Sequence, residues 1–409
     1  MQRGIEWLDS LQTRGIRPGL ENIQCLARGL DDPQNTFRTI HVTGSDGKGS
    51  VCCFLESILR EAGLRTGMFT SPQILRINEC IRIDGKEIDD DTLDSLLLDV
   101  KTVAERDSIE CTNFEALTAC AFHAFRDADV DIGVVEVGMG GRLDSTNIIT
   151  PDVTIINNIE LEHRSFLGDT LGAIASEKAG IMKMGIPCVT INNGEVLDVI
   201  KTRAKDLGCP LTVVNPENIE VNNNCSDHLD FSYKRMNYSS GLPGRFQANN
   251  AALAIEAIGL LKDSQNVEPY IKQGLSQACW HYRMEKLEEY PIVLDVTHTR
   301  KGAECLAADV SEIYGKVTLV TGMLNDKDLD GVAHILSKIA SKVYVSAPDS
   351  PRAASPEILA ADYSKFHNDV ITCATIGDAM EQALKNEGII LVTGSFRTVE
   401  DCLRWLRRM

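Results

Sequence analysis

A glycine-rich segment early in the chain carries residue types that bind phosphate. It reads Thr43-Gly44-Ser45-Asp46-Gly47-Lys48-Gly49-Ser50, directly after an apolar run and directly before a stretch with helical periodicity. Glycines let backbone N–H groups curl around phosphate oxygens, and the start of a helix adds partial positive charge. Lys48 is then placed to reach the outer phosphates. The two glycines are closer together than in the standard phosphate loop, so the alternative is an ordinary glycine-rich turn between a strand and a helix.

Further polar residues follow other apolar runs in the first half of the chain. Glu136 ends one such run and precedes a second glycine-rich stretch. A carboxylate at the end of a buried strand beside a phosphate loop is a suitable Mg²⁺ ligand, although a carboxylate satisfied by local hydrogen bonds would look the same. His163 follows the next apolar run, and Lys178 lies in a helical stretch among small apolar residues. Instead of a role in a site, His163 could have a structural role and Lys178 could face solvent.

The second half of the chain repeats this arrangement with a weaker signal. Asp295 and His298 end an apolar run shortly after Arg283, and Asn325-Asp326-Lys327-Asp328 follows another such run. Polar residues at the carboxyl ends of strands in an α/β sheet face the ligand crevice. These residues are therefore candidates for a ligand site, each weak by itself.

Short apolar runs alternate with amphipathic helical stretches along most of the chain, which predicts an α/β fold with largely parallel sheets. Strands are expected at 37–42, 65–69, 132–137, 153–157 and 187–191, and helices at 48–61, 91–104, 114–125 and 171–182. Alternation around Asp84-Gly85 predicts a hairpin.

A change in character near the middle of the chain indicates two domains. Residues 215–244 are polar and predict either a small β appendage or an irregular loop, and 246–261 predict a helix. A second α/β series follows, with strands expected at 292–294, 317–321, 342–345, 370–373 and 389–392. We therefore expect one domain over residues 1–278 and another over 279–409.

Composition excludes several classes of protein. The chain has 409 residues and a formal net charge of −18 without any block of basic residues, so no nucleic-acid partner and no anionic membrane partner is expected. No apolar run is long enough to span a bilayer, and the first residues do not resemble a secretory signal. The thirteen cysteines lack the paired spacing of a zinc site or a disulfide framework, and we expect reduced thiols in a cytoplasmic protein.

Taken together, these segments resemble the folylpolyglutamate synthase/dihydrofolate synthase branch of the Mur ligase family. The resemblance runs nearly from end to end of the chain. Its blocks are Gly15–Glu21, His41–Ser50, Thr66–Pro72, Arg76–Glu79, Glu136–Asn147, Leu167–Thr170, Glu177–Ile181 and Asp326–Asp328.

The resemblance implies a fold and a reaction. The fold is a phosphate-loop Mur-ligase-type ATPase domain followed by a smaller Rossmann-like α/β domain. The reaction is an ATP-dependent ligation in which a carboxylate is phosphorylated and an amine then attacks the acyl phosphate. The expected substrates are a folate-type carboxylate and glutamate, with ATP and Mg²⁺, and a monomer is expected because the site closes within one chain.

The resemblance also assigns roles to residues. Lys48, His163 and Lys178 would be catalytic, and Lys178 would carry a CO₂-derived carbamate. ATP would be bound by Asp46, Gly47, Lys48, Gly49, Ser50, Asn250, Arg283 and Asp295. Magnesium would be bound by Ser71, Glu136, His163 and Lys178, and the substrate by Gly19, Leu20, Phe114, Glu115, Leu143, Asp144, Ser145 and His298. Closure of the second domain would complete the site and shield the acyl phosphate from water.

Four positions in three segments depart from the family pattern. Asp46 stands where the family usually has Asn, and Glu162 stands where Asp usually precedes the histidine. Thr299-Arg300 replaces an Asn-Pro pair in a segment that lies near the incoming amino acid in the family. The alternatives are therefore a ligase of the same mechanism that acts on another carboxylated cofactor or acceptor, and a nucleotide-binding sensor that has lost ligation. Retention of Lys48, Glu136, His163 and Lys178 argues against the sensor.

Overall fold

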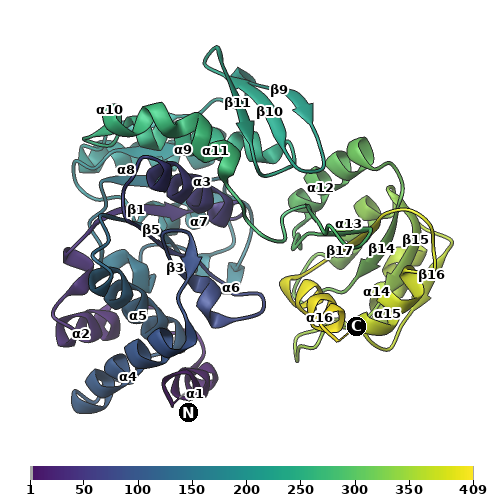
Figure 1. Ribbon diagram of the computed structural model, residues 1–409, viewed down its shortest axis with the longest axis horizontal. Helices are drawn as coiled ribbons and strands as arrows, with labels where there is room; N and C mark the ends of the chain where they lie inside the picture. Colours follow the sequence, from purple (N-terminus) through teal and green to yellow (C-terminus); the bar gives the residue numbers. More distant parts are fainter. Residues whose placement is uncertain (1–2, 409) are drawn as a thin grey trace. The chain divides into compact units, whose positions relative to one another are not determined.

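The computed structural model describes residues 3–408, and the chain divides into two compact units (Figure 1). The first unit comprises residues up to 219 together with 249–278, and the second comprises 220–248 together with the residues from 279 onward. The chain passes between the units three times. Helix α9 (Phe246–Gly259) contains one of these crossings.

An eight-stranded sheet forms the centre of the first unit, in the order β4-β3-β2-β5-β1-β6-β7-β8. The strands from β2 to β8 in this order run parallel to one another, and β3 and β4 are antiparallel. The strands are β1 (Arg38–Thr43), β2 (Thr66–Phe69), β3 (Ile81–Ile83), β4 (Lys86–Glu87), β5 (Ile132–Glu136), β6 (Val153–Ile156), β7 (Cys188–Thr190) and β8 (Leu211–Val213). The central strands are rich in Val and Ile and fully buried, as expected of a parallel sheet that is covered on both faces.

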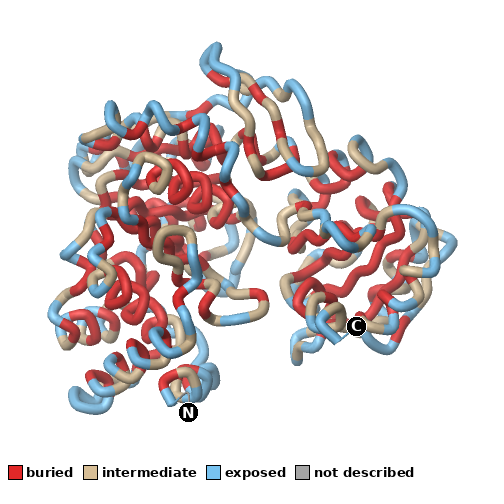
Figure 2. Tube along the Cα trace, in the orientation of Figure 1, coloured by how far each residue is buried: buried red, intermediate tan, exposed pale blue. Residues whose placement is uncertain are grey.

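Helices cover this sheet, and their apolar sides build its core. The helices are α1 (Arg3–Ser10), α2 (Glu21–Gly29), α3 (Lys48–Glu61), α4 (Asp90–Arg106), α5 (Asn113–Asp127), α6 (Arg164–Leu167), α7 (Leu171–Ala179), α8 (Gly194–Leu207), α10 (Ser264–Val267) and α11 (Ile271–Gln277). Apolar residues of α1, α2, α4 and α5 form one cluster with residues of β2, β3 and β5. Figure 2 shows this pattern as buried segments in the interior and exposed segments at the outer turns.

The second unit contains two sheets. The larger has the order β12-β13-β17-β14-β15-β16 and is parallel except for β12. Its strands are β12 (Glu285–Lys286), β13 (Ile292–Leu294), β14 (Val317–Thr321), β15 (Ala340–Val345), β16 (Val370–Thr372) and β17 (Ile390–Thr393). The smaller sheet consists of β9 (Ile219–Asn224), β10 (Leu229–Tyr233) and β11 (Met236–Ser240), in the order β11-β10-β9.

Five helices pack with the larger sheet. They are α12 (Arg300–Ile313), α13 (Leu329–Leu336), α14 (Pro356–Ser364), α15 (Ile376–Ala383) and α16 (Phe396–Leu406). Most begin with a Ser, Thr or Asp whose side chain accepts a backbone N–H of the first turn, such as Thr299 before α12 and Ser395 before α16.

The α/β fold predicted from the sequence is confirmed. The expected helix at 48–61 and the strands at 292–294 and 317–321 have the predicted bounds. The expected hairpin around Asp84-Gly85 joins β3 to β4. Of the two alternatives for residues 215–244, the β appendage is confirmed, because most of them form the antiparallel sheet of β9, β10 and β11.

None of the helices within residues 3–408 combines the length and the apolar character that a membrane crossing requires. All thirteen cysteines are free thiols, as the sequence predicts, and most of them are buried.

Candidate active site

The glycine-rich segment forms a tight loop between β1 and α3. The loop leaves β1 after Thr43, and α3 begins at Lys48. Gly47 has φ of +76°, a conformation that favours glycine. A Cβ at Gly47 would lie 2.6 Å from Asn250 Oδ1 and 2.8 Å from Asn157 Nδ2. The sequence therefore places glycine where both the backbone conformation and the surrounding side chains exclude any other residue.

Two consecutive asparagines after β6 hold this loop. Asn157 Nδ2 donates to the Asp46 carbonyl at 3.0 Å and to Asn250 Oδ1 at 2.9 Å. The Asp46 N–H donates to Asn158 Oδ1 at 3.2 Å, and the Ser45 N–H donates to the Asn158 carbonyl at 2.7 Å. Asn157 and Asn158 are absent from the residues predicted for the site. The signal that identifies them is their position at the carboxyl end of a strand that pairs with β1.

The predicted carboxylate Glu136 lies beside the loop. Parallel pairing aligns Val42 of β1 with Glu136 of β5, so both strands end at the same edge of the sheet. Lys48 Nζ lies 3.9 Å from Glu136 Oε1 and donates to the Ser45 carbonyl at 3.2 Å. The Ser71 N–H donates to Glu136 Oε2 at 3.2 Å. A cation and a buried carboxylate thus lie together at the start of α3, and the backbone of Ser71 contacts the carboxylate; carboxylate oxygens are among the ligands that Mg²⁺ prefers.

Lys178 is buried on the other side of the loop. Its side chain is 2% exposed, and Nζ donates to the Gly44 carbonyl at 2.7 Å and lies 2.8 Å from Glu162 Oε1. The alternative of a lysine that faces solvent is therefore wrong. Burial lowers the pKa of Lys178 to about 8. Burial alone would raise the pKa of Glu162, but the charges of Lys178 and Lys48 lower it to about 2.

His163 lies close to this ion pair. Its Nε2 is 3.9 Å from Glu162 Oε2, and its backbone has φ of +44° immediately before α6. The imidazole is nearly half exposed, so an ion arriving from solvent can reach it.

The second glycine-rich stretch packs against the phosphate loop through its backbone. Thr43 Oγ1 donates to the Gly140 carbonyl at 2.8 Å. The buried Asp144 carboxylate accepts the Met139 N–H at 2.9 Å and Thr146 Oγ1 at 2.6 Å. Desolvation raises the pKa of Asp144. Of the three predicted substrate residues here, Asp144 and its neighbour Ser145 are buried, whereas Leu143 is partly exposed.

The remaining predicted substrate residues of the first unit lie near the starts of α2 and α5. The ring of Phe114 stacks on Phe69 of β2, with 5.9 Å between centroids. Glu115 is buried, accepts the Thr112 N–H at 2.6 Å and thereby closes a capping box at the start of α5. Gly19 and Leu20 directly precede α2 and are partly exposed.

The three candidates of the second unit lie around one end of β13. The Asp295 carboxylate is buried and accepts the N–H groups of Met284 at 3.0 Å and Thr297 at 2.8 Å. Desolvation raises the pKa of Asp295. The guanidinium of Arg283 lies 5.4 Å from the centre of the Phe396 ring, and the His298 ring lies 5.7 Å from it.

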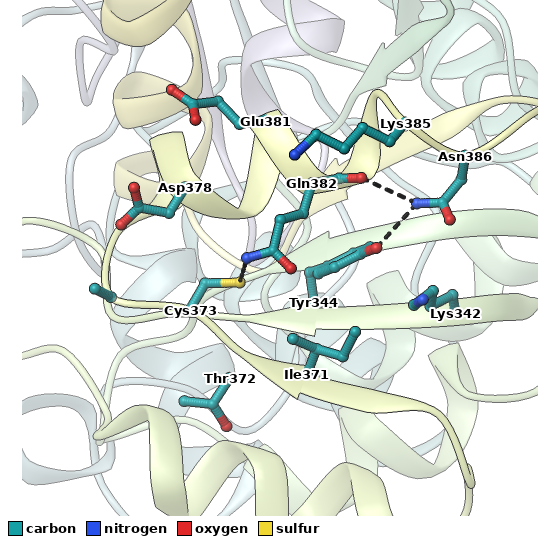
Figure 3. Close-up of a pocket in the computed structure, with 11 residues that line it drawn as sticks. Lys342, Tyr344, Ile371, Thr372, Cys373, Asp378, Glu381, Gln382, Lys385 and Asn386 are labelled. Carbon is teal, nitrogen blue, oxygen red and sulfur yellow. Dashed lines mark hydrogen bonds between the residues drawn. The ribbon is translucent and has the colours of Figure 1, made fainter.

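A separate pocket lies in the second unit between β15, β16 and α15 (Figure 3). Tyr344 Oη accepts from Asn386 Nδ2 at 3.0 Å, and Gln382 Nε2 lies 3.5 Å from Cys373 Sγ. The lining is of mixed charge and contains none of the site residues predicted from the sequence.

The first unit is thus a nucleotide-binding domain of the phosphate-loop class. The glycine loop between β1 and α3, Lys48 at the start of the helix and Glu136 on the adjacent strand lie together at one edge of its sheet. Side chains of Asn157, Asn158 and Lys178 hydrogen-bond to the loop and hold it in one shape.

Comparison with known proteins places the chain in a family. The sequence profile of the Mur ligase middle domain matches residues 42–258, and that of the Mur ligase glutamate ligase domain matches 282–396. The dihydrofolate synthase/folylpolyglutamate synthase of Bacillus subtilis is 33% identical over 99% of both chains. The enzyme of the same name from Escherichia coli is 31% identical over 97% of this chain and 93% of its own length.

Comparison with solved structures gives the same family as comparison with sequences. The Mycobacterium tuberculosis folylpolyglutamate synthase complexed with ADP has a TM-score of 0.87 and 29% identity, covering 98% of this chain and 96% of that chain. E. coli FolC in complex with DHPP and ADP has a TM-score of 0.85 and 29% identity, covering 99% and 97%. The chain belongs to the folylpolyglutamate synthase/dihydrofolate synthase family of Mur ligases, and it is an ATP-dependent ligase.

Proposed function

We propose that this ligase joins L-glutamate to the carboxylate of a folate-type substrate, either a pteroate or a folylglutamate. ATP is the energy source, and ADP and phosphate are the other products. The names of the full-length relatives support this substrate class. The structural observation that carries the proposal is the convergence of Lys48, Glu136 and the Lys178–Glu162 pair around one phosphate loop.

The first chemical step is transfer of the γ-phosphoryl group. A substrate carboxylate oxygen attacks the γ-phosphorus, the bond to the bridging oxygen breaks, and ADP leaves with that electron pair. The backbone of Asp46, Gly47, Lys48, Gly49 and Ser50 would hold the phosphates, because N–H groups at the start of α3 point toward the loop. Lys48 Nζ would offset charge on the outer phosphates, which is the main demand of phosphoryl transfer.

Magnesium fits the donor set beside the loop. Glu136 and Ser71 have side chains with oxygen donors, the backbone N–H of Ser71 donates to Glu136 at 3.2 Å, and His163 lies beside Glu162. A bound Mg²⁺ neutralises charge on the phosphates and the attacked carboxylate. Ser71, Glu136 and His163 would hold it.

Lys178 is suited to carbamate formation. CO₂ reacts only with a neutral amine, and a pKa of about 8 leaves an appreciable neutral fraction near neutrality. The amine nitrogen attacks the carbon of CO₂, loses one proton to solvent and becomes an anionic carbamate. That anion would supply a further ligand for magnesium beside the loop, as the family resemblance implies.

The second step forms the amide. The amino nitrogen of glutamate attacks the acyl carbon, the carbon–oxygen bond to phosphate breaks, and the nitrogen loses a proton. We place the folate-type substrate near Gly19, Leu20, Phe114, Glu115, Leu143, Asp144 and Ser145. Asn250 of the first unit and Arg283 and Asp295 of the second are proposed nucleotide contacts, and His298 a substrate contact. Because Asp144 and Glu115 hold backbone N–H groups, each would shape its part of the pocket as well as contact substrate.

The test is ADP release by the purified protein with Mg-ATP, offered glutamate together with dihydropteroate or a reduced folate. Turnover that requires both the pteroyl compound and glutamate, with a product heavier by one glutamyl residue in mass spectra, is the expected result. Turnover with another amino acid in place of glutamate would show that the ligase uses a different acceptor. ATP binding without turnover on any pteroyl compound would overturn the folate assignment and favour another carboxylated substrate.

A further inference from the structure

The turn between β9 and β10 brings together three side chains that ligate metals. Cys225 Sγ, a carboxylate oxygen of Asp227 and a ring nitrogen of His228 all lie within 4.8 Å of one another. The set contains a single cysteine, so paired-cysteine spacing gives no signal for it. A thiol, a carboxylate and an imidazole on four consecutive residues are three different donor types at one point of the fold.

The backbone of this turn is held in place from both sides. The Cys225 N–H donates to the His228 carbonyl at 2.9 Å. This hydrogen bond fixes the backbone of the residue that carries the thiol relative to that of the residue that carries the imidazole. The preceding residue, Asn224, donates through Nδ2 to Asp309 Oδ1 of α12 at 2.9 Å and accepts the Gly244 N–H at 3.2 Å. Cys225 therefore directly follows a residue, Asn224, that is held by hydrogen bonds. A bound ion would not have to order the turn by itself.

The side chains of the set already face one another. His228 Nδ1 lies 2.9 Å from Asp227 Oδ1, and its Nε2 lies 3.6 Å from Asp230 Oδ2. The hydrogen bond from His228 lowers the pKa of Asp227. Cys225 Sγ accepts from Asn223 Nδ2 at 3.2 Å. The imidazole is partly exposed, so an ion in solvent can reach it.

We propose that Cys225, Asp227 and His228 form a binding site for a divalent cation of the zinc class. Zinc accepts sulfur, nitrogen and oxygen donors together, with bonds of about 2.0–2.3 Å and thus donor separations of roughly 3.3–3.8 Å. The present donors approach that spacing and need only rotamer shifts to reach it. The thiolate selects zinc over magnesium, because Mg²⁺ requires oxygen ligands.

The proposed site has three protein ligands and one open position. Asp230 lies at the other ring nitrogen of His228, so water rather than Asp230 would complete the tetrahedron. Binding displaces the thiol proton of Cys225 to solvent. The bound ion would tie the end of β9 to the start of β10.

Cobalt titration of the reduced, nucleotide-free protein tests the proposal directly. Co²⁺ in a tetrahedral site with a thiolate ligand gives a charge-transfer band in the near ultraviolet, and the Ser71–Glu136–His163 site contains no thiol to produce one. We expect one equivalent of Co²⁺ to generate the band, Zn²⁺ to remove it, and Cys225→Ser to abolish it. Cys279→Ser, which removes an exposed cysteine elsewhere, should leave it unchanged. Absence of the band in the unaltered protein, or its persistence in Cys225→Ser, overturns the proposal.

Two further measurements separate ligation from effects on folding. His228→Ala and Asp227→Asn should each weaken Zn²⁺ binding by about tenfold or more in competition titrations. In the unaltered protein, Zn²⁺ should slow alkylation of Cys225, as measured by peptide mass spectrometry. Two controls accompany this measurement: Mg²⁺ should not slow alkylation of Cys225, and Zn²⁺ should not slow alkylation of Cys279. Equal alkylation of Cys225 with and without Zn²⁺ would contradict the site without depending on any variant.

Discussion

The amino group of Lys178 lies 2.8 Å from the carboxylate of Glu162 and donates to the carbonyl of Gly44 at 2.7 Å. One buried cation is thus connected both to the phosphate loop and to the residue that precedes His163. Glu162 stands where the family usually has Asp, and its longer side chain spans the distance to this lysine. The ion pair therefore links two segments whose chemistry is proposed to act on the same phosphates.

Replacing Lys178 by Met should abolish ligation while the fold is retained. Methionine fills a similar volume without an amine that can form a carbamate. We expect kcat/KM to fall by about a hundredfold or more, in the range found when one preorganised electrostatic group is removed. ADP release measures the loss, and a carbamate signal in ¹³C spectra with labelled bicarbonate should disappear at the same time.

The matched control is Lys201→Met on an exposed position of α8, which should change neither readout. Full activity in Lys178→Met would show that the buried amine has no part in the reaction. A loss of activity with no carbamate signal in the unaltered protein would assign Lys178 to the reaction as an amine.

Glu162 should make the protein sensitive to acid. Its pKa in the folded state is about 2, below the ordinary value of 4.5. Between these values the unfolded chain binds a proton that the folded chain does not, so this carboxylate stabilises the fold above about pH 4.5 and the contribution is lost as pH falls toward 2. Glu162→Gln should therefore flatten the decline in stability between pH 4.5 and 2.

At pH 7 the same variant should lower the free energy of unfolding by about 1–3 kcal/mol, because a buried donor loses its charged partner. Urea unfolding at pH 7 and pH 3 measures both effects. Glu105→Gln, which alters an exposed ion pair with Lys101, is the control and should be nearly neutral. Parallel pH profiles for Glu162→Gln and the unaltered protein would exclude this carboxylate as the source of the acid sensitivity.

Gly47→Ala should damage the phosphate loop. The substitution combines backbone strain at φ +76° with a Cβ 2.6 Å from Asn250 Oδ1 and 2.8 Å from Asn157 Nδ2. We expect a loss of about 2–4 kcal/mol in stability, the sum of a left-handed alanine and a displaced buried hydrogen bond. Thermal unfolding and nucleotide binding should both show the effect.

Gly63→Ala provides the comparison that separates the two causes. Gly63 also has positive φ, +83°, but a Cβ there meets no atom within 4 Å. This variant should cost only about 1 kcal/mol for the backbone and leave nucleotide affinity unchanged. Equal effects of the two substitutions would mean that contact with Asn157 and Asn250 contributes nothing.

Local pattern was sufficient to predict the scaffold of the site. The loop from Thr43 to Ser50 lies between an apolar run and a stretch with helical periodicity, and each of these signals extends over only a few residues. Glu136 could be predicted as a neighbour of the loop because parallel strands end at one edge of a sheet. Residue spacing alone was therefore enough to predict the strands, the loop and the helix that position the site in the first unit.

Contacts that depend on tertiary placement could not be predicted in this way. Asn157 reaches Asn250 across 93 positions of sequence, and Lys178 reaches Gly44 across 134. The strand-end position of Asn157 marks it as a candidate but does not give its partners, and nothing in the local pattern distinguishes Lys178 from a solvated lysine. The cluster of Cys225, Asp227 and His228 was missed for another reason, because its donors are of three types and match no paired-cysteine spacing.

Asn157→Ala should weaken ATP binding more than it weakens the fold. The amide of Asn157 holds the Asp46 carbonyl and Asn250 Oδ1 at once, so its removal frees the loop that would surround the phosphates. We expect the KM for ATP to rise about tenfold, equivalent to about 1.4 kcal/mol, with a smaller change in kcat. Asn78→Ala removes another buried amide, which bonds the Ile88 carbonyl and the Asp90 carboxylate and no loop residue. A rise in KM shared equally by both variants would indicate general destabilisation, whereas a rise confined to Asn157→Ala assigns the effect to the shape of the phosphate loop.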